Sequence, residues 1–429
     1  MDYAVLNKNN YLGKIILLCF NFTFFFLCNV RMSPSLLQLQ ATGLEDVYLT
    51  QDPQINIFKY NYYRYVNFAT ETIKLETNII SNFGKKMTCE IPKRGHLLSK
   101  LHLHIKLPQL VKKDGSYACW SDTIGYSIFS EPIELMIGGI VVDRLYPQFL
   151  NAWDELTTSD KRLGKNLMLL KSDVYSANFN NATKQNDLII PLDFWFTKDY
   201  NLALPLLSMY HQNIKVNFKL RNFEECINYD GILEPDYVPI VTSSVYAEYI
   251  YLDDVILKQF KSQKHTYLIQ QVQYNEDEVI PANTSFYNTR IKLTNPCKEL
   301  VFFAVEKQNI INNNRFVYSK TADNSPLILA ASLLLDGKLR FDNLPEFYYR
   351  VIFPQNIHSV IPLKYIYTMP FSTRPEDNQP TGSLNLSRFN DITLALTTTD
   401  TVEMNLYVFG ISYNIITVEN GMLTMEFLI

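Results

Sequence analysis

The sequence lacks the features that mark most catalytic and metal-binding proteins. Its six cysteines are spread over 429 residues and form no Cys-x-x-Cys pair, so neither a zinc knuckle nor a disulfide framework is indicated. No Gly-x-Ser-x-Gly sequence and no Gly-x-x-x-x-Gly-Lys-Ser/Thr loop is present, which leaves serine hydrolysis and nucleotide hydrolysis without support. We therefore expect a protein that is not an enzyme, and we assign it no catalytic residue, no metal site and no cofactor.

An excess of charge of either sign is also lacking. The chain has 39 basic and 43 acidic residues, which gives a formal net charge of −4. Proteins that bind nucleic acid through its phosphates usually carry a strong positive field. We therefore expect no direct nucleic-acid binding, and we interpret the Phe-Lys and Tyr-Arg pairs at 58–65 as sheet core or as contacts between chains.

Glycine is scarce, whereas aromatic residues are abundant. The chain has only 14 Gly but 27 Phe and 28 Tyr. Aromatic side chains favour strands, and a low glycine content argues against a disordered or low-complexity chain. The composition therefore predicts a folded protein that is rich in β-structure.

Apolar and polar residues alternate in several short segments, which is typical of strands with one buried face. These segments are Leu101–Leu107, Lys215–Leu220, Arg290–Leu293 and Glu403–Val408. Turn sequences separate such segments: Asp114-Gly115, Gly138-Gly139, Asp230-Gly231, Asp336-Gly337 and Asn420-Gly421. Helical periodicity is confined to short pieces such as Phe149–Leu156, while Leu202–Leu207 reads as a turn. The pattern predicts an all-β protein made of antiparallel sandwiches with short loop helices.

Two sandwiches are expected, because one rarely needs nearly four hundred residues. Pro235 and Pro239 mark the expected joint, so the domains are predicted at residues 32–235 and 236–429. A weak internal sequence repeat supports a duplication. Leu135–Gly139 precedes Asp143, and Leu333–Gly337 precedes Asp342, which lies 199 residues after Asp143 (342 − 143). Each copy consists of an apolar strand, a glycine turn and a second strand that carries the Asp.

Residues 1–31 form an apolar leader. Ile15–Val30 is almost wholly apolar, and Lys8 and Lys14 precede it, as in a signal peptide or a short membrane anchor. Three explanations remain open: translation that starts at Met32, a true signal or anchor, or a buried arm. We favour the start at Met32, and an N-terminal peptide recovered from residues 1–31 would exclude it.

Blocks of sequence after Met32 closely resemble one viral family. The first block runs from Leu39 to Glu76 and begins Leu-Gln-Ala-Thr-Gly-Leu-Glu-Asp-Val-Tyr-Leu-Thr. Others follow in order: Ile133–Gly139, Trp153–Leu156, Ile190–Phe196, Leu202–Leu206, Glu248–Asp253, Asn295–Leu300, Arg374–Ser383, Asn385–Phe389 and Ser412–Asn414. As a set they resemble the major capsid proteins of the nucleocytoplasmic large DNA viruses.

The resemblance implies a fold and a function. Members of this family fold as two consecutive eight-stranded antiparallel jelly rolls, a double jelly roll. It implies a structural protein of the virion that forms homotrimers, and these pseudo-hexameric capsomers tile an icosahedral shell. The expected partners are neighbouring capsomers, minor capsid proteins and an internal membrane beneath the shell, with assembly in the host cytoplasm.

Two other readings compete with this one. A minor capsid or penton-like jelly-roll protein would be less abundant in particles and need not trimerise. A metal-dependent β-sandwich enzyme or a glycan-binding protein would use His102 and His104, which share one face of a strand, but Pro108 and Gln109 stand where cupin metal sites have a carboxylate. Asn181, Asn283 and Asn385 match the glycan acceptor pattern.

Overall fold

The computed structural model describes residues 34–77, 82–110, 118–121, 123–158, 168–169, 185–229, 241–399 and 401–427. The chain divides into two compact units, residues 1–65 and 66–429. The first unit contains two short helices, α2 (Pro34–Gln40) and α3 (Leu44–Thr50), neither of which has a buried residue. No helix in the described residues is long and apolar enough to cross a membrane, and the apolar leader lies outside them.

The first half of the larger unit consists of two four-stranded antiparallel sheets. The sheet here called sheet A has the order β1 (Phe68–Glu76), β10 (Thr242–Leu252), β3 (Leu97–Leu107) and β7 (Asn186–Pro191). The opposite sheet has the order β2 (Lys86–Ile91), β8 (Ile214–Lys219), β5 (Ile133–Ile137) and β6 (Ile140–Leu145). Counted along these eight strands, the orders are first-eighth-third-sixth and second-seventh-fourth-fifth, the arrangement of a jelly roll.

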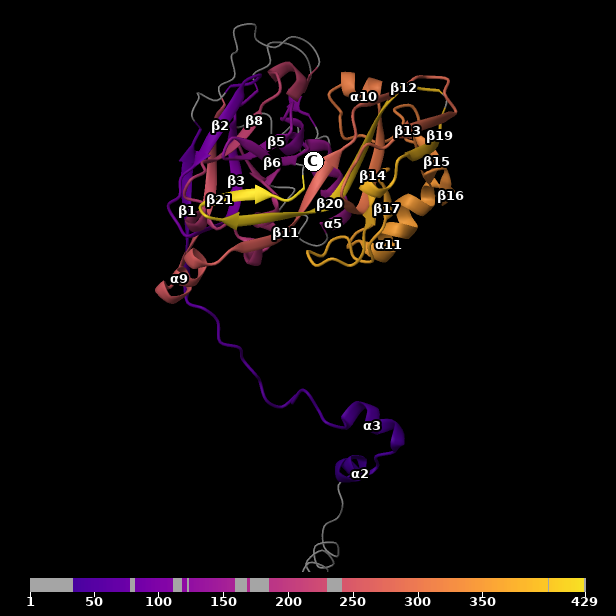
Figure 1. Cartoon of the computed structure of the whole chain (residues 1–429). Helices are drawn as coiled ribbons and strands as arrows, with labels where there is room; N and C mark the ends of the chain where they lie inside the picture. The colour runs from indigo at the N-terminus through magenta and orange to yellow at the C-terminus, as the bar shows by residue number, and fades with distance from the viewer. Residues whose placement is uncertain are drawn as a thin grey trace, which may run out of the picture. The chain divides into compact units, whose positions relative to one another are not determined.

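The second half repeats this arrangement beside the first (Figure 1). The sheet here called sheet F has the order β11 (His265–Tyr274), β20 (Met404–Glu419), β14 (Pro296–Glu306) and β17 (Tyr367–Pro370). The opposite sheet has the order β13 (Phe286–Arg290), β19 (Ile392–Thr398), β15 (Ile328–Leu335) and β16 (Lys338–Pro345). Because the strand orders of the two halves are identical, the predicted double jelly roll is confirmed.

Shorter elements complete the described part of the chain. Sheet F gains β12 (Glu278–Ile280), β18 (Leu384–Asn385) and β21 (Met422–Met425), and β4 (Ala118–Trp120) pairs with β9 (Ile227–Tyr229). The helices are α4 (Ile124–Ser127), α5 (Pro147–Thr157), α8 (Trp195–Lys198), α9 (Asp254–Ser262), α10 (Lys307–Ile311) and α11 (Phe353–Ile357). The short 3-10 helices are η1 (Tyr200–Leu202), η2 (Leu206–Ser208), η3 (Phe223–Cys226) and η5 (Leu386–Arg388), and η4 (Tyr348–Ile352) is a π-helix.

The internal repeat in the sequence corresponds to the same hairpin in each half. Gly138 and Gly139 join β5 to β6 with φ of 61° and 87°, and Asp336 and Gly337 join β15 to β16 with φ of 47° and 76°. Two positive φ values in a two-residue loop suit the right-handed twist of a hairpin, which explains the glycines. The two Asp residues are not equivalent, because Leu135 pairs with Asp143 whereas Leu333 pairs with Phe341.

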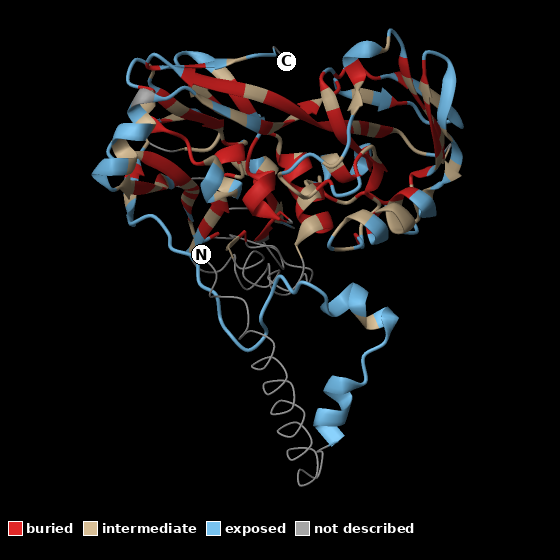
Figure 2. Cartoon of the chain, turned by 60° about the horizontal axis from the view of Figure 1, so that its bottom comes forward, coloured by how far each residue is buried: buried red, intermediate tan, exposed pale blue. Residues whose placement is uncertain are grey.

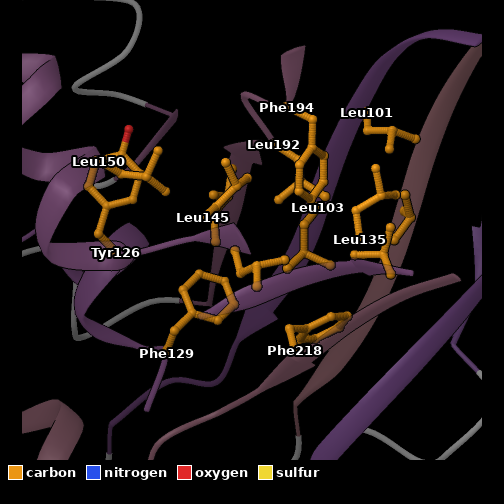
Figure 3. Packing of buried hydrophobic residues seen from close by; sticks show 14 of the residues in the cluster. Leu101, Leu103, Tyr126, Phe129, Leu135, Leu145, Leu150, Leu192, Phe194 and Phe218 are labelled. Carbon is orange, nitrogen blue, oxygen red and sulfur yellow. The ribbon is translucent and has the colours of Figure 1, made fainter. Parts of the chain in front are cut away.

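Most of the predicted strands are confirmed. In β3, Leu101, Leu103 and Ile105 are fully buried, and Leu103 packs among Leu135, Leu192 and Phe194 (Figure 3). Segments 215–220 and 403–408 lie largely in β8 and β20, and 149–156 lies in α5. The turns at 114–115 and 230–231 fall outside the described residues, whereas Asn420-Gly421 joins β20 to β21.

One expectation differs from the structure. The strand predicted at Arg290–Leu293 was wrong in its position: β13 ends at Arg290, and the buried side chains of Ile291 and Leu293 belong to the connection that leads to β14. Burial thus continues after the backbone has left the sheet. The expected joint at 235–239 lies outside the described residues, but β10, which follows it, pairs with β1 and β3 of the first half.

Leu103→Asp should abolish the soluble folded protein. The side chain of Leu103 is fully buried, and a buried charge without a partner costs about 3–5 kcal/mol. Soluble yield and thermal unfolding measure the effect. Lys106→Asp, on the exposed side of the same strand, is the control and should leave a folded protein. A normal soluble yield of Leu103→Asp would mean that the strand faces are wrongly assigned.

Candidate functional site

Helix α5 belongs to the first half of the larger unit and packs against the second half. It directly follows β6, and Pro147 at its first turn has the backbone φ that a helix start requires. Most of its apolar residues are buried, and two of its polar groups bond to the second half. The hydroxyl of Tyr318 donates to Asn151 Oδ1 at 2.9 Å, and the Val360 amide donates to the Leu156 carbonyl at 3.1 Å.

Aromatic rings fill the space between α5 and sheet F. Phe149 on α5 lies 5.5 Å from Phe409 on β20, measured between ring centroids. Tyr146 lies 5.5 Å from Tyr274 and 5.7 Å from Phe409, and Phe409 lies 5.9 Å from Phe303. Each such pair contributes about 0.5–1.5 kcal/mol beyond the area that it buries. The rings therefore hold the first half against the outer face of sheet F.

Strand β14 is buried on both faces as a result. Leu300, Phe302 and Ala304 point into the core of the second jelly roll. The alternate residues Val301, Phe303 and Val305 belong to the hydrophobic cluster that also contains the core of the first jelly roll. Figure 2 shows buried residues running from one half into the other. The core of the first jelly roll therefore extends onto the outer face of sheet F, whereas the inner face of this sheet belongs to the separate core of the second jelly roll.

A buried charged cluster lies at the same joint. His358 follows α11, and its side chain is fully buried. Its Nε2 lies 2.8 Å from Oε1 of Glu299 on β14, its Nδ1 lies 3.1 Å from Oε1 of Glu376, and the Trp153 ring of α5 stands edge-on at 5.7 Å. With a carboxylate at each ring nitrogen, the imidazolium can donate both hydrogen bonds.

The two carboxylates stabilise the charged form of His358. Burial alone would lower the pKa of His358, but the charges and hydrogen bonds of Glu299 and Glu376 outweigh it and raise this pKa to about 9. Burial pushes the pKa of Glu376 upward, but the hydrogen bonds from His358 and Ser359 lower it overall. The cluster is therefore an ion network that the joint keeps away from water.

Lys298, next to Glu299, is also buried at the joint. Its Nζ donates to Gln270 Oε1 at 2.8 Å and to the Pro375 carbonyl, and it lies 6.0 Å from the centroid of the Trp153 ring. Burial, with a smaller contribution from the charge of Lys198, lowers the pKa of Lys298 to about 7. These contacts tie β14 to β11, to the loop after β17 and to α5.

Comparison with known proteins identifies the family. Residues 56–253 match the family described as major capsid protein N-terminus, and residues 257–424 match the large eukaryotic DNA virus major capsid protein. The major capsid protein of Pyramimonas orientalis virus is 30% identical over 416 residues, which cover 91% of this chain and 98% of that protein. The chain belongs to the large eukaryotic DNA virus major capsid protein family. It is thus a structural protein of the virus shell and not an enzyme.

Other members of this family and their solved relatives agree. The major capsid protein of Paramecium bursaria Chlorella virus 1 is 27% identical over 442 residues, covering 91% of this chain and 98% of that protein. A quasi-atomic model of the PBCV-1 virus capsid matches with a TM-score of 0.74 at 23% identity, covering 87% of this chain and all of that one. The Faustovirus major capsid protein matches with a TM-score of 0.70 at 12% identity, covering 89% and 96%. These structures support the double jelly-roll fold.

The histidine pair that the sequence singled out lies on the outer face of sheet A. His104 Nε2 lies 2.9 Å from Asp187 Oδ1, and burial lowers the pKa of His102. Among the residues that the structure describes, no group of three His, Cys, Asp or Glu side chains could hold a metal ion. The sequence analysis treated His358 as isolated, because its partner Glu299 lies 59 residues away. The charged pair Lys298-Glu299 at the start of an apolar strand was the feature that could have indicated a buried charged cluster.

The three glycan acceptor positions stay predictions. Asn181 lies outside the described residues. Asn283 is exposed in a left-handed turn with φ of 64°. Asn385 is half-buried, and its Oδ1 accepts a hydrogen bond from the Ser387 amide.

The buried cluster makes stability depend on pH. Because the pKa of His358 is raised from 6.5 to about 9, the stabilisation is fully present below pH 6.5 and is lost as the pH rises towards 9. The expected loss from His358 is about 2–3 kcal/mol of unfolding free energy. Lys298, whose pKa is lowered to about 7, changes stability in the opposite direction as the pH rises, so urea unfolding at both pH values measures the His358 contribution as the difference between the wild type and a His358 variant.

His358→Gln should remove this pH-dependent loss. His104→Gln is the matched control, because His104 bonds to a single, mostly exposed carboxylate and should keep the wild-type dependence. If His358→Gln loses as much stability as the wild type between the two pH values, the cluster is not its source.

Proposed function

We propose that three copies of the chain associate into a pseudo-hexameric capsomer that tiles an icosahedral virus shell. The observation that carries this proposal is the pair of jelly rolls with identical strand order, held together by apolar packing on the outer face of sheet F. Because each chain contributes two similar jelly rolls, a trimer with threefold symmetry contains six of them and has a six-sided outline. The relatives that resemble this chain are named major capsid proteins, and one solved structure is a model of a virus capsid.

We also propose where the two halves divide. Strand β10 pairs with β1 and β3, so it belongs to the first jelly roll although it follows residue 236. The two family matches end at residue 253 and begin at residue 257, where α9 starts the connection to β11. These observations favour a division near residues 253–264 over one at 235–236.

The remaining partners follow from the same assignment. Neighbouring capsomers contact the tile in the shell, and minor capsid proteins and an internal membrane lie beneath it. The near-balanced charge supports a tile that does not bind the genome directly. Cys89, Cys119, Cys226 and Cys297 are buried and unpaired, which supports assembly in the reducing host cytoplasm.

Native mass spectrometry of the purified chain tests the trimer. The expected mass is three times that of the purified chain, which is 49.9 kDa when residues 1–429 are all present, and it should persist on tenfold dilution. A monomer that is present in few copies per particle would instead favour the minor capsid or penton-like reading. A monomer with bound metal would favour the β-sandwich enzyme and contradict the proposal.

A further inference from the structure

Strand β20 belongs to both halves of the larger unit. It is 16 residues long. Met404, Leu406 and Val408 in its first part belong to the core of the second jelly roll. Ile416 and Val418 near its end belong to the hydrophobic cluster that contains the core of the first jelly roll. The end of sheet F, where β20 pairs with β11 and β21, therefore extends over the first half (Figure 1).

The short strand β21 packs on the first half together with this part of β20. Leu423 of β21 lies across from Val418, and its side chain is 5% exposed within the same hydrophobic cluster. Met425 lies across from Ile416 and packs against this cluster. The hairpin formed by β20 and β21 thus lies on the first jelly roll, although its first strand begins in the second.

A loop of the first half bonds to the open edge of β21. The Gln212 side chain accepts a hydrogen bond from the Leu423 amide at 2.7 Å and donates one to the Leu423 carbonyl at 3.2 Å. The His211 amide donates to the Gly421 carbonyl at 3.1 Å. Backbone groups on this edge of β21 are therefore bonded as they would be by a further strand, which an edge strand otherwise lacks.

The same loop explains why residue 421 is a glycine. Gly421 has a φ of 82°, and a Cβ atom there would lie 2.6–2.8 Å from ring atoms of His211 and Tyr210. Gly337, between β15 and β16, has a similar φ of 76°, but a Cβ atom there would meet nothing within 4 Å. The turn alone accounts for Gly337, whereas Gly421 is also required by the close approach of the first half.

We infer that the β20–β21 hairpin is a strap that holds the second jelly roll against the first, with residues 210–212 as its catch. The strap and the packing of α5 use different segments of the chain, and two separate contacts prevent a rotation that one contact would permit. The role of the strap in the shell rests on the proposed function, because a shell needs subunits of one fixed shape. The strap itself can be tested on the single chain.

Gln212→Ala removes both hydrogen bonds to Leu423. Hydrogen exchange followed by mass spectrometry should show about 10-fold faster exchange of the Leu423 amide. The Val360 amide, which donates to the Leu156 carbonyl of α5, reports on the other contact between the halves. Its exchange should become about 3- to 10-fold faster if the strap holds the halves together.

Gln308→Ala is the matched control for this variant. The Gln308 side chain donates to Asn312 at 3.2 Å within one exposed segment of the second half, so its loss should change neither exchange rate. Gly421→Ala tests the catch through its shape and should speed exchange of both amides. Gly337→Ala bears similar backbone strain without the close approach and should leave both rates unchanged. Circular dichroism checks that all four variants are folded.

The outcomes separate the strap from the proposed trimer. Faster exchange of the Leu423 amide alone would mean that Gln212 only caps an edge strand, and it would overturn the strap. Unchanged exchange of the Leu423 amide in folded Gln212→Ala and Gly421→Ala would overturn the contact itself. A wild type that is monomeric in native mass spectrometry but shows both changes in exchange would contradict the trimer and leave the strap standing.

Discussion

The packing of α5 against the outer face of sheet F is the interaction on which the rest of the structure depends. If only the segment between β10 and β11 joined the two jelly rolls, they would be free to change their relative position. Phe149 and Tyr146 pack on Phe409, and β14 is buried on both faces, so that sheet F separates two cores and contributes side chains to each. A shell of many identical subunits needs subunits of fixed shape, because small errors in the angle between the two jelly rolls would prevent the shell from closing.

The charged groups at this joint have a different role from the aromatic ones. Burying Glu299, His358 and Lys298 costs desolvation energy, and a buried ion network is weak evidence for added stability. The charged groups and their hydrogen-bond partners all belong to the second half, so the network fixes how β14, the segment after α11 and the loop after β17 lie relative to one another. The Trp153 ring of α5 packs against this network from the first half.

Local sequence patterns predicted the local structure well. The alternation in Leu101–Leu107 predicted the faces of β3, and the Gly-containing turns after Ile137 and Leu335 predicted equivalent hairpins. The strand expected at 290–293 was misplaced because burial continues beyond the sheet edge at Ile291. The packing contact between the two halves could not be predicted, since residues such as Trp153 and His358 meet there although they lie about two hundred positions apart in the sequence. In hindsight the unbroken apolar run Leu300–Val305, compared with its polar-alternating counterpart in β3, showed which face is covered inside the chain.

Equilibrium unfolding followed by two probes tests the contact between the two halves most directly. The three tryptophans of the chain, Trp120, Trp153 and Trp195, all lie in the first half, whereas far-ultraviolet circular dichroism reports on strands of both halves. If the packing on the outer face of sheet F joins the two jelly rolls into one cooperative unit, tryptophan fluorescence and circular dichroism change in the same transition at every chain concentration tested. A circular dichroism transition that continues after the fluorescence change is complete would show that the second half unfolds on its own, and it would contradict the account.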